Sequence, residues 1–127
     1  MDVDEQCMVK ADEVKAGKHR YLILKLNDRS TEIVVEKVGD SGDYDAFVAD
    51  LPASECRWGV YGFDFQGRRL CLITWSPEEA YFKERMVQAT CRSDLRRALW
   101  SITDEVQAID YDEVSYEVVS QKVRRGR

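Results

Sequence analysis

Apolar and polar positions in the first third of the chain predict a helix followed by two strands. Between residues 4 and 15 the apolar side chains are spaced mostly three or four positions apart among charged ones, which suits a helix with acids at its start. Gly17 is expected to end this helix. The apolar runs at 21–26 and 33–35 are nearly continuous and flank a polar segment, so they predict a hairpin of buried strands.

The next segment combines turn residues with a short apolar stretch. A turn cluster at 40–43 precedes residues 44–51, and Pro52 follows. Asp43 is well placed to cap the first turn, so we expect a short helix here. The region around 40–45 superficially resembles a calcium loop, but it lacks the regular alternation and the terminal glutamate of such loops. We therefore expect a turn and a helix cap, and no metal site.

Two further apolar runs predict an antiparallel ribbon. Residues 58–65 and 70–75 are strand-like, and only four residues, 66–69, separate them, which is the length of a tight hairpin connection. Arg68 and Arg69 would make the tip of this hairpin basic.

The longest helical pattern runs from about 79 to 99. Its apolar residues recur at helical spacing and predict a stripe that packs on the sheet: Val87, Cys91, Leu95, Ala98 and Leu99. At 100° per residue, three arginines project from a different side and form what we call the basic row: Arg85, Arg92 and Arg96. Thr90 lies inside this segment, where its hydroxyl either bonds back to the backbone and bends the helix or stays on the surface.

The last third predicts one more strand and one more helix. Residues 105–109 alternate like a short strand, and 112–123 carry valines at helical spacing ahead of a basic tail. The predicted order is helix, strand, strand, helix, strand, strand, helix, strand, helix, without repeats or a linker. This order and the length of 127 residues predict one α+β domain spanning 1–127.

Composition narrows the function classes. Apolar residues make up 44% and charged residues 34% of the chain, which suits a globular protein, and no run reaches the roughly 18–20 apolar residues of a membrane span. The acidic start at 1–5 is the reverse of a secretory signal, so a cytoplasmic protein is expected. The net charge of −5 disfavours nucleic-acid binding. Basic residues gather in the last third, which would meet a partner with an acidic face.

The residue types needed for catalysis are scarce. Four scattered cysteines, none in a C-x-x-C pair, are expected to be reduced and mostly buried: Cys7, Cys56, Cys71 and Cys91. Phosphate-loop, dinucleotide, zinc-protease and nucleophile-elbow motifs do not occur, so no enzyme activity, catalytic residue or cofactor is expected. His19, the single histidine, is expected to be exposed in the turn before the first strand, with a pH sensor as the alternative.

Five blocks of the sequence resemble the ADF/cofilin family, in order and at family-like spacing, and the resemblance is greatest to fungal and protist cofilins. The blocks are Asp50–Arg57 with Val60 and Tyr61, Thr74–Pro77, Lys83–Ala89, Asp94–Leu99, and Glu113–Tyr116 with Val123–Gly126. The resemblance implies an ADF-homology fold, in which a mixed, mainly antiparallel sheet of about five strands is flanked by helices on both faces. It differs at Gln88, where the family usually has tyrosine, and in a shorter hairpin after residue 65.

The resemblance also implies an actin-binding protein that binds monomers and filaments and promotes filament disassembly by severing or depolymerisation. The residues at the matching positions form two surfaces. The monomer-type surface comprises Val3, Asp4, Lys83, Arg85, Met86, Arg92, Arg96 and Arg97. The filament surface comprises Arg68, Arg69, Lys122 and Arg125.

Two alternatives stay open at this point. One is a monomer-sequestering or branch-regulating relative with weak binding to filament sides, and the other is a peripheral protein that responds to phosphoinositide headgroups. The resemblance further implies a monomeric protein of the actin cytoskeleton. Family members regulated at the N-terminus carry an early serine, whereas the first serine here is Ser30, so phosphorylation of that kind is not expected.

Overall fold

The computed structural model describes residues 1–40 and 42–125, so Ser41 of the predicted turn and the basic tail beyond Arg125 lie outside the described residues. The strands are β1 (Asp2–Val3), β2 (Tyr21–Leu26), β3 (Glu32–Gly39), β4 (Arg57–Asp64), β5 (Arg68–Trp75) and β6 (Asp104–Ala108). The helices are α1 (Glu5–Lys15), α2 (Tyr44–Ala49), α3 (Phe82–Thr90), α4 (Arg92–Ala98) and α5 (Tyr116–Arg125).

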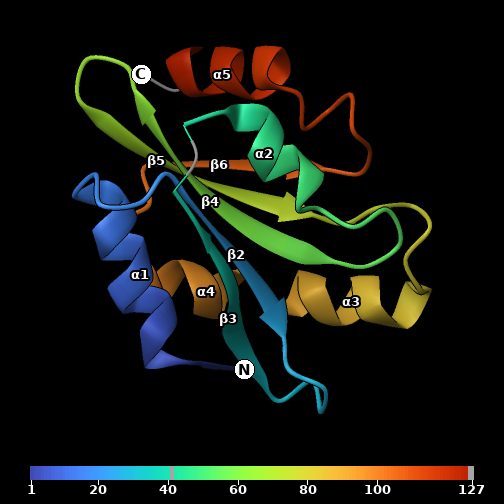
Figure 1. Cartoon of the computed structure of the whole chain (residues 1–127). Helices are drawn as coiled ribbons and strands as arrows, with labels where there is room; N and C mark the ends of the chain where they lie inside the picture. The colour runs from blue at the N-terminus through green and yellow to red at the C-terminus, as the bar shows by residue number, and fades with distance from the viewer. Residues whose placement is uncertain (41, 126–127) are drawn as a thin grey trace.

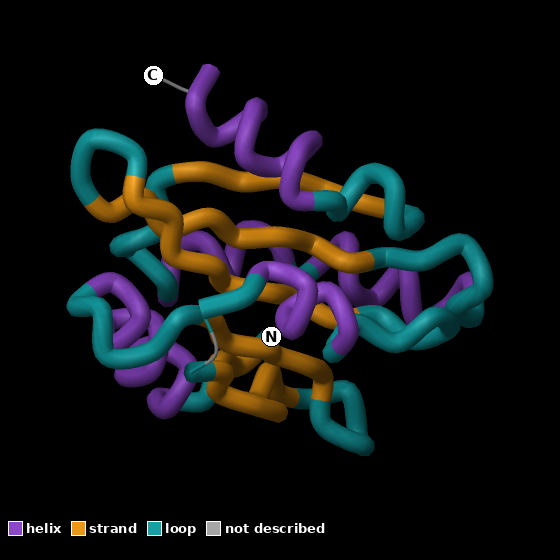
Figure 2. Tube along the Cα trace, turned by 45° about the horizontal axis from the view of Figure 1, so that its top comes forward, coloured by secondary structure: helices purple, strands orange, loops and turns teal. Residues whose placement is uncertain are grey.

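The strands form one six-stranded sheet in the order β1-β3-β2-β4-β5-β6. The inner pairs β3–β2, β2–β4 and β4–β5 are antiparallel, while β1 and β6 add to the two edges in parallel. Figures 1 and 2 show the sheet between helices, with α1, α3 and α4 on one side and α2 and α5 on the other. The predicted α+β architecture with helices on both faces is confirmed.

Alternation along the central strands explains why the apolar runs are nearly continuous. In β2, Leu22 and Leu24 point into the core under α1 and α4, whereas Tyr21 and Ile23 point into the core under α2 and α5. Successive side chains of a strand point to opposite faces, so a sheet covered on both faces needs apolar residues at every position. The helices can therefore occupy both faces.

The structure also differs from the sequence prediction at several boundaries. The short β1 was not predicted, because two residues give no periodic signal; its register, Val3 opposite Ile33, is set by the neighbouring strand. The last helix begins at Tyr116 and not at residue 112. Residues 110–115 form turns instead, in which Asp110 accepts a hydrogen bond from the backbone N–H of Glu113.

The predicted long helix at 79–99 is wrong in its length and continuity. It starts at Phe82 and breaks between α3 and α4, where the Thr90 hydroxyl and the Cys91 thiol both bond the carbonyl of Val87 at 2.7 and 3.2 Å. The N–H of Cys91 reaches the carbonyl of Gln88, one residue nearer than in an α-helix. Thr90 therefore does bond back to the backbone, and the regular α-helical hydrogen-bond pattern is interrupted at Cys91.

The four cysteines are free and buried, as predicted. Burial raises the pKa of Cys7 and Cys71 to about 12 and that of Cys56 to about 11. These thiols are therefore protonated near neutral pH and pack as small apolar side chains.

Candidate functional site

The N-terminal residues of the monomer-type surface are held by both an edge strand and a helix. Val3 pairs with Ile33, and the Asp4 carboxylate caps α1 by accepting from the N–H of Gln6 at 3.0 Å. The Met1 ammonium donates to Asp94 of α4 at 2.9 Å. These contacts place the start of the chain beside α4, so residues 93 positions apart in sequence share one surface.

Helix α3 presents the exposed part of the same surface. The Met86 side chain is 54% exposed, and Lys83 is exposed one turn earlier. Arg85 is half-buried, and its Nε donates to the Ser76 hydroxyl at 3.1 Å. Lys83 and Met86 are therefore available to a partner, while Arg85 also fixes α3 to the preceding turn.

Two arginines of the basic row share one carboxylate on β6. Arg92 binds Glu105 through Nε at 2.7 Å and Nη2 at 3.0 Å, and Arg96 Nη1 adds a third bond at 2.8 Å. Burial alone would raise the pKa of Glu105, but these hydrogen bonds outweigh it and hold the pKa below its ordinary value. Within the predicted row, Arg92 and Arg96 of α4 share Glu105, whereas Arg85 of α3 bonds Ser76 instead.

Arg97 is the most exposed arginine side chain of α4, at 75%. It contacts Asp94 at 3.3 Å, and Asp94 also receives the Met1 ammonium. The ammonium lowers the pKa of Asp94, so this carboxylate stays ionised and tethers the N-terminus near neutral pH.

Gln88 is a structural residue whose role the sequence did not reveal. It is buried, and its Nε2 donates to the carbonyls of Arg57 at 2.9 Å and Trp75 at 3.1 Å. These carbonyls belong to neighbouring ends of β4 and β5, so one amide fastens α3 across the sheet. In the sequence, the only indication of this role is that a polar residue lies beside the apolar stripe of the helix.

The hairpin of the filament surface differs from its prediction. Its tip is formed by 65–67, with positive φ at Gln66 and Gly67, and the two arginines lie within β5. Arg69 makes a bidentate pair with the nearly buried Asp104, and Arg68 bonds the carbonyl of Gly62. The prediction of a basic tip is therefore corrected, because both guanidinium groups turn back onto the sheet.

Helix α5 carries the other half of the filament surface. Lys122 and Arg125 are exposed on its last turns. Arg124 lies over the ring of Phe65 at 4.3 Å, which joins the end of α5 to the hairpin tip. Figure 1 shows the tip of the β4–β5 hairpin near the end of α5, and α5 covers the opposite face of the sheet from α3 and α4.

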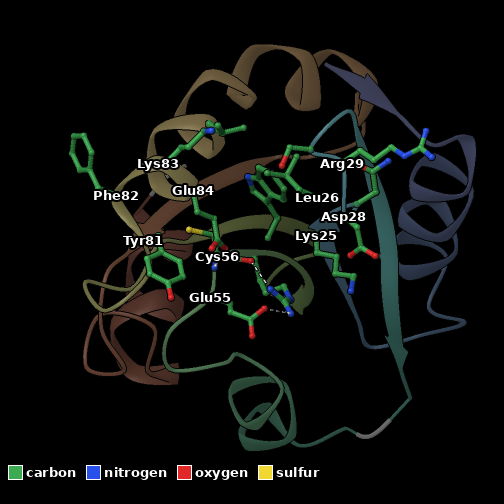
Figure 3. A pocket seen from close by; sticks show the side chains of 15 residues that line it. Lys25, Leu26, Asp28, Arg29, Glu55, Cys56, Tyr81, Phe82, Lys83 and Glu84 are labelled. Atoms are coloured by element: carbon green, nitrogen blue, oxygen red, sulfur yellow. Dashed lines mark hydrogen bonds and ion pairs between the residues drawn. The ribbon is translucent and has the colours of Figure 1, made fainter.

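A groove of about 770 Å³ opens beside the start of α3. Its walls are the loop after β2, the start of β4 and the first turns of α3 (Figure 3). Inside it, the Glu84 carboxylate accepts the backbone N–H of Cys56 at 2.6 Å. Among the described residues, no group of three or more histidine, cysteine, aspartate or glutamate side chains is placed to hold a metal ion.

His19 is not the exposed turn residue that was predicted. Its Nδ1 lies 2.6 Å from Asp40 and its Nε2 lies 3.0 Å from Glu13, and the side chain is 22% exposed. The hydrogen bonds to Asp40 and then to Glu13 raise the pKa of His19. The residue therefore connects the end of α1 to the end of β3.

A family model described as cofilin/tropomyosin-type actin-binding protein matches residues 1–124. The chain belongs to this family. The family resemblance of the five sequence blocks is thus confirmed over nearly the whole chain. In the described part of the chain, no helix is long and apolar enough to cross a membrane.

Individual family members are similar to this chain over almost their full length. The chain is 43% identical to cofilin of Mycosarcoma maydis, covering 98% of this chain and 94% of that protein, and 41% identical to cofilin of Schizosaccharomyces pombe, covering 97% and 94%. The crystal structure of Streptomyces griseoflavus cofilin matches with a TM-score of 0.92 and 42% identity, covering 98% of both chains. The fold and the order of its elements are therefore those of cofilins.

Proposed function

We propose that the protein binds actin monomers and filaments and promotes filament disassembly without catalysing a reaction. The observation that carries the proposal is the match to the actin-binding family over residues 1–124, together with cofilins at about 40% identity. Helices α3 and α4, which carry most of the monomer-type surface, and α5, which carries Lys122 and Arg125, cover opposite faces of one sheet.

The monomer-type surface would act through one apolar contact surrounded by charges. Met86 is exposed and conformationally adaptable, so it suits insertion into an apolar cleft. Lys83 and Arg97 are exposed cations before and after it in sequence and would orient the partner. Glu105 would hold Arg92 and Arg96 in fixed positions, so their remaining donors meet the partner without first being ordered.

The filament surface would use different residues in different ways. Lys122 and Arg125 are exposed and would contact a neighbouring actin subunit directly. Arg68 and Arg69 would contribute mainly by fixing the base of the hairpin, because both are engaged in internal contacts. A protein that binds one filament geometry more tightly than another shifts the filament toward it, and this difference in affinity would drive disassembly.

Co-sedimentation with actin filaments, alongside a monomer-binding assay, tests this proposal. We expect the unchanged chain to pellet with filaments or to increase soluble actin. Lys83→Glu combined with Met86→Ser should abolish both binding modes. Lys122→Glu combined with Arg125→Glu should reduce filament pelleting and leave monomer binding intact. The control is Lys15→Glu combined with Lys18→Glu, which reverses two positive charges, as the Lys122 and Arg125 variant does, but lies outside both surfaces.

Two results would contradict the proposal in different ways. An unchanged chain that binds neither actin monomers nor filaments refutes the function itself. Binding that survives the Lys83 and Met86 changes refutes the assigned surface.

The short hairpin favours a second candidate function. Only 65–67 connect β4 to β5, so little surface projects toward a filament, which favours a monomer-sequestering protein with weak filament binding. Full binding to actin monomers without pelleting with filaments would select this function.

The proposal has three further parts. Lys83 and Arg97 would bind phosphoinositide headgroups, the protein would be a monomer, and it would belong to the cytoplasmic actin cytoskeleton. Vesicle sedimentation, analytical ultracentrifugation and microscopy test them.

A further inference from the structure

A small pocket of about 120 Å³ lies between the loop that joins α1 to β2, the end of β3 and the start of β5. The charged side chains that line it, among the described residues, are Lys18, His19, Arg20, Asp40 and Arg68. His19 and Asp40 bond each other at 2.6 Å, so their charges offset each other. The positive charge that the pocket presents therefore comes from the lysine and the two arginines.

The two arginines direct their guanidinium groups to one neutral acceptor. Arg20 Nη1 and Arg68 Nη1 both donate to the carbonyl oxygen of Gly62, at 3.2 and 3.3 Å. Both also contact the carboxylate of Asp64, at 3.8 Å from Arg20 and 3.4 Å from Arg68, and this carboxylate is 66% exposed. Ion pairs of this length at an exposed carboxylate are weak, because solvent screens them. The two like charges are therefore only partly neutralised within the fold.

Lys18 adds a third positive charge at the same place. Its side chain is exposed, and within residues 1–40 and 42–125 it forms no ion pair or hydrogen bond. Gly17 beside it has φ +85°, and a Cβ atom at this position would lie 3.1 Å from Nη2 of Arg68. The absence of a side chain at residue 17 therefore keeps the approach to Nη2 open.

The chemistry of this lining favours a phosphate group as the ligand. A guanidinium group offers two parallel N–H donors that match the oxygens of a phosphate, and a lysine adds a point charge. The pocket is well below the volume of a site for a drug-sized molecule, so it suits one phosphate group and not a whole nucleotide. A flat anionic membrane would meet the exposed carboxylates of Asp40 and Asp64 as well as the cations, whereas a small ion can enter between them.

We propose that Lys18, Arg20 and Arg68 form a binding site for one soluble phosphate group, either inorganic phosphate or a small phosphate monoester. The bound phosphate would connect the end of α1 to the base of the β4–β5 hairpin, because Lys18 follows the helix and Arg68 begins β5. Only Arg68 is shared with the two actin surfaces, and the inference does not depend on the proposed function.

Titration of the full chain with inorganic phosphate, followed by nuclear magnetic resonance at constant ionic strength, tests the site. We expect saturable shifts of the backbone amide signals of residues 17–20 and 68. Lys18→Gln should weaken binding about tenfold, because a charged hydrogen-bond donor is lost. Arg68→Lys keeps the charge but loses the two parallel donors, so it should also bind more weakly. The control is Lys15→Gln, which makes the same charge change outside the pocket and should bind as the unchanged chain does.

Thermal unfolding separates a loss of the site from a loss of the fold. In phosphate-free buffer, Lys18→Gln should unfold at the same temperature as the unchanged chain, because the lysine side chain has no partner in the described part of the fold. Phosphate should then raise the midpoint of the unchanged chain and of Lys15→Gln more than that of Lys18→Gln. The comparison between variants is needed because phosphate also stabilises proteins in general.

Two results would overturn the proposal. Shifts that do not saturate, or that are equally large in Lys18→Gln, would show a general effect of ions and no site. Sedimentation with vesicles that contain phosphatidylinositol bisphosphate gives the second result. If Lys18 and Arg68 are needed for vesicle binding while inorganic phosphate does not bind, the ligand is a membrane surface and the proposed soluble phosphate is wrong.

Discussion

His19 shows how a single residue depends on partners that are distant in sequence. Its two ring nitrogens face the carboxylates of Asp40 and Glu13, 21 and 6 residues away. Because both partners are negatively charged, the protonated imidazole is favoured in the folded protein. The sequence showed an isolated histidine in a turn, and nothing in the local pattern indicated that β3 would place Asp40 beside it.

This arrangement predicts that stability falls as pH rises. The folded pKa of His19 is raised, so its contribution is fully present below the unfolded pKa of about 6.5 and is lost as pH rises through the higher folded value. Thermal unfolding of the unchanged chain and His19→Gln, measured from pH 6 to 9, should give a difference in midpoint that shrinks with pH. The Met1 ammonium titrates in both proteins, so it cancels in the comparison. A difference that is constant across this range would contradict the prediction.

At the scale of elements, α3 and α4 illustrate what helical periodicity can and cannot specify. The apolar stripe was correct: Cys91, Leu95 and Leu99 are buried against the sheet. The single long helix was wrong, because side-chain bonds from Thr90 and Cys91 to Val87 compete with the backbone pattern. The interruption lies between Arg85 on α3 and the two arginines of α4 that reach Glu105.

The carboxylate of Glu105 therefore joins α4 to β6, which gives a prediction at this scale. Glu105→Gln keeps the size of the side chain but removes the charge that three guanidinium hydrogen bonds share. We expect a loss of about 1–2 kcal/mol in the free energy of unfolding, measured by urea denaturation. Glu78→Gln, at an exposed position, is the matched control and should change little.

The Glu105→Gln variant can also be tested for binding to actin monomers. If Arg92 and Arg96 must be fixed in place to bind actin, Glu105→Gln will weaken monomer binding. If Glu105 instead competes with the partner for both arginines, the same variant will bind actin more tightly, and the positioning role assigned to Glu105 would be wrong.

At the scale of the whole molecule, one sheet separates two cores and supports two surfaces. Leu95 belongs to the core under α1 and α4, and Val119 belongs to the core under α2 and α5. Strands β2, β4 and β5 contribute side chains to both cores, so neither core can form without them. We therefore expect residues 1–127 to unfold as a single unit.

Two core variants test this expectation. Leu95→Ala and Val119→Ala remove methyl groups from opposite cores, and each should lower the free energy of unfolding by about 2–4 kcal/mol. In each variant, urea transitions followed by far-ultraviolet circular dichroism and by tryptophan fluorescence should coincide. Separate transitions would show that the two cores unfold independently, contrary to the prediction of one domain.

Features that depend on the local order of residues could be predicted before the fold was known. Apolar runs at 21–26 and 58–65 specified strands covered on both faces, Asp43 specified the start of a helix, and the family blocks specified the fold and the partner class. These features are encoded by residues that are neighbours in the chain. Periodicity, capping and motif spacing therefore suffice to predict them.

Which charged side chains are free to meet a partner depends on how distant segments pack together. Arg69 and Asp104 are 35 residues apart, and Arg92 and Glu105 are 13 apart, yet each pair forms a bidentate contact. A charged residue has the same sequence pattern whether it faces solvent or a carboxylate on another strand. Its availability depends on packing between distant segments, so Lys83, Met86 and Lys122 could be recognised as exposed only in the folded chain.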